Sequence, residues 1–199
     1  MRTASLLALT ALFASCATHA DAAERNVRHA AARTADGGIA TGTAVGYRGP
    51  NGAAGVRGHA LVTDGSGTMN TVSGAAGRTA GGTYGRVGTT TVHADGTVTH
   101  RAGAAAQGPN GSATTSGSFT RIADGTYSGQ RSTTAQGTNG GNYSGTTSYA
   151  NGNGTHTTNV TAKNGDSYSG TTTWTRGEGA THSGTCKDPA GNLTTCPGR

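Results

Sequence analysis

The 199-residue sequence has few large apolar side chains. Leu, Ile, Val and Phe together make about a tenth of the chain, and aromatic residues make 5%. A doubly wound α/β enzyme needs strands that are nearly continuous apolar runs, and no such runs are present. A helical bundle needs apolar residues at a 3.6-residue spacing, for which a Gly- and Thr-rich chain is poor material. The composition therefore excludes both architectures.

Acidic residues are also scarce, since only nine are present and the formal net charge is +6. Asp36, Asp64, Asp95 and Asp124 each precede Gly, a turn position where Asp hydrogen-bonds its own backbone. Catalytic carboxylates instead need a concave, partly dry site that tunes their pKa. No nucleophile elbow, phosphate-binding loop or zinc-protease motif is found. We therefore expect a protein that is not an enzyme and uses no cofactor.

Cysteine is limited to three residues. Cys186 and Cys196 flank the segment KDPAGNLTT and are symmetric about Gly191, so a hairpin centred there would place them opposite each other. In an oxidising compartment this spacing predicts a disulfide. A zinc site would need four ligands and closer cysteines, so we expect no metal at this pair.

The N-terminus has the order of a secretory signal in residues 1–22: one Arg, a short apolar run and then small residues. The apolar run is too short to span a membrane. Two processing routes remain open. Cleavage at the Ala20-Asp21-Ala22 site would release a soluble protein. Alternatively, residues 13–16 resemble a bacterial lipobox, in which Cys16 would be acylated and would anchor the chain to a membrane.

Glycine, at 36 residues, is abundant and regularly placed. Asn-Gly and Asp-Gly pairs favour two-residue hairpin turns of type I′, and Thr-rich segments typical of strands lie between them. Residues 39–199 therefore predict an all-β antiparallel meander of short hairpins, as an elongated twisted sheet or an open barrel. Residues 23–38 are interpreted as a flexible tether. The turn pairs begin at positions 51, 64, 81, 95, 110, 124, 139, 151 and 164, followed by Gly177-Glu178-Gly179 and Gly191-Asn192.

One hairpin can be predicted in detail. A two-residue turn at Asp95-Gly96 pairs His93 with Val98, and it places His93 and His100 on the same face. Nothing nearby supplies the third and fourth ligands of a zinc site, so no metal is expected here either.

Aromatic residues alternate with glycine in the C-terminal half. Strand alternation places Tyr143, Gly145 and Tyr149 on one face, and a ring on a neighbouring strand can lie over the bare glycine backbone. Two interpretations remain open: these rings form a thin core, or they form an exposed stripe that stacks on sugars. The stripe would contain Tyr127, Tyr143, Tyr149, Tyr168 and Trp174.

The basic residues are scattered singly, unlike the clusters of nucleic-acid-binding proteins. The positive charge favours a weak attraction to anionic polysaccharide or lipopolysaccharide, and exposed sheet edges favour self-association. We expect an exported, non-enzymatic bacterial envelope, surface or matrix protein, located in the periplasm, at the outer membrane surface or outside the cell. The alternative is a carbohydrate-binding module that uses Tyr143, Tyr168 and Trp174.

Overall fold

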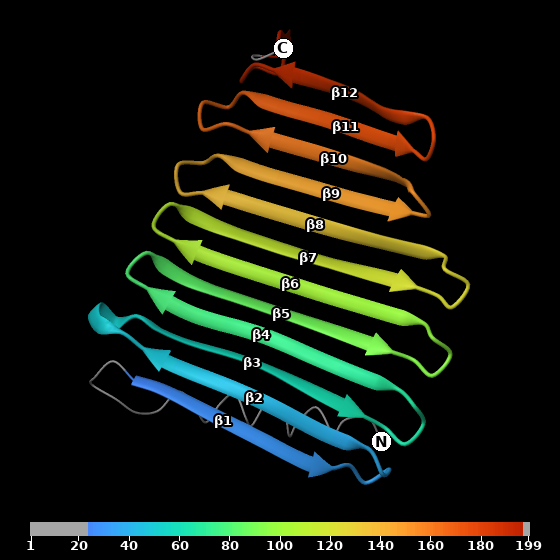
Figure 1. Cartoon of the computed structure of the whole chain (residues 1–199). Helices are drawn as coiled ribbons and strands as arrows, with labels where there is room; N and C mark the ends of the chain where they lie inside the picture. Colours follow the sequence, from blue (N-terminus) through green and yellow to red (C-terminus); the bar gives the residue numbers. More distant parts are fainter. Residues whose placement is uncertain (1–23, 197–199) are drawn as a thin grey trace. The chain divides into compact units, whose positions relative to one another are not determined.

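The computed structural model describes residues 24–196 (Figure 1). Apart from one 3-10 turn, Pro50–Gly52, all regular structure in this range is β-strand, and the strands follow one another in chain order within an antiparallel meander. The predicted fold class is therefore confirmed. The proposed signal, including Cys16, lies outside the described residues. The strands are β1 (Glu24–Arg33), β2 (Ile39–Arg48), β3 (Ala54–Thr63), β4 (Met69–Thr79), β5 (Gly82–Val92), β6 (Val98–Gly108), β7 (Gly111–Arg121), β8 (Tyr127–Gly137), β9 (Asn142–Ala150), β10 (Asn153–Thr161), β11 (Ser167–Thr175), β12 (Gly179–Lys187) and β13 (Leu193–Thr194).

The chain divides into two compact units, Met1–Ala102 and Gly103–Arg199. In the first unit, each strand from β1 to β5 pairs antiparallel with the next. In the second unit, the strands from β7 to β13 pair in the same way. Consecutive pairing requires only short connections, which explains why the turn-rich sequence adopts a meander.

Residues 24–33 form strand β1, so the prediction of a flexible tether is wrong for them. Val27 lies opposite Val45, and Arg25 lies opposite Tyr47. The ladder with β2 satisfies backbone groups that an open β2 edge would leave unpaired. Pairing of this kind depends on backbone hydrogen bonds and not on a large apolar surface. The Ala-rich sequence of β1 therefore lacks the apolar pattern from which a strand is usually predicted.

The described residues contain almost no buried core. The buried apolar residues are Ala44, Ala60 and Cys186, and no large side chain is fully buried. The closely packed strand pairs are consecutive ones, and no described element forms a second layer over either unit's sheet. Each unit is therefore held mainly by backbone ladders and by cross-strand contacts between side chains.

The Asp95-Gly96 turn differs from the predicted one. The N–H of His93 donates to the carbonyl of Thr97 at 2.8 Å, and the N–H of Gly96 donates to the carbonyl of His93 at 2.9 Å. Gly96 has a φ of 81°, whereas Asp95 is not left-handed. The loop thus contains three residues, 94–96, and the predicted register is wrong by one. Because a one-residue slip changes the face of a side chain, His93 and His100 do not form the expected pair.

Most Asp-Gly and Asn-Gly turns share this three-residue form, in which only the Gly needs a positive φ. Asn151-Gly152 is an exception and forms the predicted two-residue turn, with φ of 52° and 90° and with Ala150 opposite Asn153. Hydrogen bonds of the three-residue form join Thr34 with Gly38, Ile122 with Thr126, Gly137 with Gly141, Ala162 with Asp166, and Asp188 with Asn192.

The predicted disulfide between Cys186 and Cys196 is confirmed, with the two Cα atoms 5.3 Å apart. The hairpin is not centred as expected, because Cys186 lies opposite Thr194. Cys196 therefore follows the end of β13 and returns to Cys186 from beyond the ladder. The bond fixes this short last strand against β12.

Candidate functional site

The strand registers of the second unit collect its aromatic residues on one face. Phe119, Gly129, Tyr149, Gly154 and Trp174 lie opposite one another in consecutive strands from β7 to β11. Rings and glycines thus alternate across the sheet. We call this line of residues the first aromatic row.

The rings of this row lie on the backbone of neighbouring strands. An added Cβ at Gly129 would overlap the Tyr149 ring, and one at Gly154 would overlap the Trp174 indole. Tyr127 extends the row, since its ring centroid lies 6.3 Å from that of Phe119 and 6.5 Å from that of Tyr149. Each ring is half-buried, because the sheet covers one side of it and no described element covers the other.

A second aromatic row lies on the same face, toward the opposite ends of these strands. Tyr143, Val160 and Tyr168 are opposite one another on β9, β10 and β11. Tyr143 leans along its own strand over Gly145, and Tyr168 lies over Gly170. These contacts stabilise strand glycines and hold the half-buried rings in fixed positions.

Polar side chains fill the space between the two aromatic rows. His156 is hydrogen-bonded at both ring nitrogens by threonine hydroxyls, each 2.8 Å away. His182 is hydrogen-bonded by one threonine hydroxyl at 2.8 Å and by the phenol of Tyr168 at 2.9 Å. These networks fix donors and acceptors beside the rings. This polar row consists of Arg131, Thr147, His156, Thr172 and His182.

The opposite face of the second unit has a different chemistry. From β7 to β12, the strand positions that alternate with the aromatic face are Ser, Thr, Asn or Gln, apart from Ala150, Gly179 and Lys187. Neighbouring hydroxyls are hydrogen-bonded across strands, as between Thr173 and Thr181 at 2.7 Å. This sheet therefore has one aromatic face and one hydroxyl face.

The described aspartates support turns. Asp95 and Asp124 each accept the backbone N–H of the second following residue at 2.8 Å. These backbone hydrogen bonds lower the pKa of both carboxyls, and a hydrogen bond from the Ser66 hydroxyl is the main cause of a lowered pKa at Asp64. The Asn192 side chain lowers the pKa of Asp188 in the same way. Within residues 24–196, no three His, Cys, Asp or Glu side chains come together as a metal site would require.

All five predicted stripe residues lie on the aromatic face, at either end of the strands. Sequence reasoning missed Phe119, although its place opposite Gly129 repeats the ring-on-glycine pattern. In the described part of the chain, no helix is long and apolar enough to cross a membrane. No protein-family model, no curated protein and no solved structure matches this chain.

Proposed function

We propose that this chain is an exported, non-enzymatic surface or matrix protein whose second unit binds polysaccharide through its aromatic face. The observation that supports this most is the arrangement of rings in two rows on a face that no described element covers, with a polar row between them. The apolar C–H face of a sugar stacks on an aromatic ring, and its hydroxyls then need nearby donors and acceptors. The aromatic face offers both together.

The spacing of the rings favours an extended glycan. Tyr149 and Trp174 belong to β9 and β11, and strands two apart are separated by about 10 Å. A chain lying across the strands would meet rings at regular intervals and His156 or Thr147 beside them. The aspartates of this unit act at turns, which supports a binding role over a catalytic one.

Affinity electrophoresis through gels that contain hydroxyethylcellulose, glucomannan or xylan tests this proposal. The wild-type protein should be retarded by at least one of these neutral polysaccharides. Trp174→Ala and Tyr149→Ala should each weaken binding about tenfold, which corresponds to about 1.4 kcal/mol for the loss of a stacking ring.

The matched control is Thr173→Ala, since Thr173 is the chain neighbour of Trp174 and lies on the hydroxyl face. This variant should bind as the wild type does, and circular dichroism should show that each variant keeps its β-structure. Equal retardation of the Trp174 and Thr173 variants, or no retardation of the wild type by any of the three polysaccharides, would contradict the proposal.

A further inference from the structure

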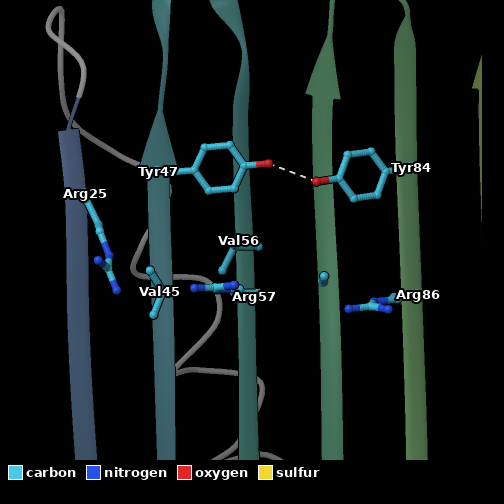
Figure 2. A pocket seen from close by; sticks show the side chains of 8 residues that line it. Arg25, Val45, Tyr47, Val56, Arg57, Tyr84 and Arg86 are labelled. Carbon is cyan, nitrogen blue, oxygen red and sulfur yellow. Dashed lines mark hydrogen bonds between the residues drawn. The ribbon is translucent and has the colours of Figure 1, made fainter.

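The first unit carries an open groove on one face of its sheet (Figure 2). Arg25, Arg57 and Arg86 extend into it from β1, β3 and β5, and Tyr47 and Tyr84 line it from β2 and β5. All five side chains are exposed. Three guanidinium groups therefore share one concave surface with two phenols.

The register explains how the groove is built. Tyr47 and Tyr84 stand at the two sides of paired Gly55 and Gly77, and each ring lies over the glycine next to it. Their hydroxyls meet at 2.9 Å. The two bare glycines make room for this tyrosine bridge, which forms one wall of the groove.

The arginines lie alongside the tyrosine bridge. Arg57 and Arg86 are both opposite Ala75, which lies between them on β4. The small Ala75 side chain leaves the space between the two guanidinium groups open. Since they come from strands two apart, their backbones are separated by about 10 Å. Arg25 continues the positive charge onto β1 (Figure 2).

No described acidic side chain neutralises this charge. The described aspartates of the unit lie in the β1–β2, β3–β4 and β5–β6 turns, at the ends of the strands away from the tyrosine bridge. None of the three arginines forms an ion pair or a side-chain hydrogen bond within residues 24–196. Among the described residues, their guanidinium donors are therefore not taken up by another side chain.

The tyrosine hydroxyls place further hydrogen-bonding groups beside the arginines. The hydrogen bond to Tyr84 is the main cause that raises the pKa of the Tyr47 phenol above its ordinary value. The Tyr47 phenol therefore carries no charge at neutral pH that would oppose an anion.

We propose that this groove binds an acidic polysaccharide through the carboxylates of its uronate sugars. A guanidinium group matches a carboxylate with two parallel hydrogen bonds, which an ammonium group cannot offer. Arginines repeated across strands suit a chain with repeated charges, and the tyrosine rings offer apolar surface to the sugars. This site lies in a different unit from the aromatic face and differs from it in ligand charge.

Binding of polygalacturonate to the full chain tests the site, with fully methyl-esterified polygalacturonate as the uncharged comparison. Arg57→Gln and Arg86→Gln should each weaken polygalacturonate binding about three- to tenfold at low salt, and the double variant more strongly. The methyl ester should bind at least tenfold more weakly than the acid. Raising the ionic strength from about 0.05 to 0.5 M should weaken binding because salt screens exposed charges.

Arg78→Gln is the matched control. Arg78 is exposed on β4 of the same unit, and strand alternation places it on the face opposite the groove. It changes the net charge equally and should leave binding unchanged. The Trp174→Ala variant should retain polygalacturonate binding even if its binding of neutral glycans is lost. The proposals for the groove and for the aromatic face can therefore be contradicted independently.

Three outcomes would overturn the proposal. Equal weakening by Arg57→Gln and Arg78→Gln would show a general charge effect. Equal affinity for the methyl ester would show that carboxylates are not recognised. Equally tight binding of inorganic phosphate or of a DNA oligonucleotide would assign the groove to phosphate groups instead.

Discussion

At the scale of single residues, each turn needs a residue that tolerates a positive φ and a side chain that accepts a backbone hydrogen bond, and two different residues meet these needs. Gly96 adopts a positive φ that other residues rarely tolerate, and the preceding Asp95 accepts a backbone N–H through its carboxylate. Likewise, Asp124 accepts a backbone N–H and Gly125 adopts the positive φ. Turn stability is therefore linked to the charge state of the carboxylate.

This linkage predicts a loss of stability in acid. The folded-state pKa values of Asp64, Asp95, Asp124 and Asp188 are lowered, so their stabilising effect is complete above the unfolded-state pKa of about 4. The effect is lost as the pH falls through the lower folded-state values. The urea concentration at the unfolding midpoint should therefore be constant from pH 7 to 5 and should drop below pH 4.

Asn substitutions separate the charge from the hydrogen bond. Asp124→Asn keeps an oxygen acceptor, so it should fold at pH 7 but show a weaker acid dependence of the urea midpoint. Asn139 occupies the same position in a three-residue turn, and Asn139→Asp should introduce additional acid dependence. If Asp124→Asn leaves the acid dependence of the urea midpoint unchanged, the Asp124 turn does not contribute to that dependence.

At the scale of strands, contacts between aromatic rings and the glycines opposite them provide packing that a hydrophobic core would otherwise provide. Gly154 has the Trp174 indole directly above its backbone, and that contact needs the absence of a Cβ. Gly85 offers a comparison, since its nearest atom to an added Cβ is a carbonyl oxygen at 4.0 Å. The two glycines are therefore expected to differ sharply in their tolerance of substitution.

Gly154→Ala should lower the free energy of unfolding by about 1–3 kcal/mol, because the added Cβ would overlap the Trp174 indole and lie 2.7 Å from the carbonyl oxygen of Ser148, so both must move. Gly85→Ala should be neutral or stabilising by up to about 1 kcal/mol, because Ala loses less conformational entropy than Gly in a strand. Urea unfolding followed by circular dichroism measures both values. Similar losses for the two variants would show that the ring contact is not responsible.

The disulfide should stabilise a local element. In the chain-entropy view, closing the loop between Cys186 and Cys196 contributes about 3 kcal/mol. β13 pairs with β12 through only two residue pairs. Reduction of the disulfide should therefore release β13. Hydrogen exchange of the reduced protein should increase at Thr194 and remain unchanged in β7–β9. Unchanged exchange at Thr194 would mean that the ladder alone holds β13.

Which side chains of one strand share a face follows from strand alternation and could be predicted from the sequence. Tyr143 and Tyr149 share a face of β9, and Tyr168 and Trp174 share a face of β11, because alternation within a strand does not depend on the turn type. That both pairs lie on the same face of the sheet follows only from the cross-strand register. The register across Asp95-Gly96 could not be predicted in this way, because the dipeptide fits both two- and three-residue loops. Strand β1 was missed although Asp36-Gly37 before β2 repeats the turn pattern. The groove of the first unit needed the cross-strand register, which brings Tyr47 and Tyr84 together.

At the scale of the whole molecule, both units repeat one principle of construction. Their strands pair in chain order, and none of the large side chains in residues 24–196 is fully buried. A broad sheet face is then directly accessible to ligands, as we propose for the aromatic face of the second unit and the groove of the first. Most of the free energy of folding must come from backbone hydrogen bonds and cross-strand contacts.

The lack of a second layer over the sheets of residues 24–196 has a calorimetric consequence. The heat capacity increase on unfolding reflects mainly newly exposed apolar surface and is about 12–15 cal/mol/K per residue in ordinary domains. Residues 24–196 expose little additional apolar surface when they unfold, so calorimetry should give a value per residue well below that range. A smaller increase flattens the dependence of stability on temperature. The protein should therefore lose little stability on cooling, a condition under which proteins held by hydrophobic burial are weakened.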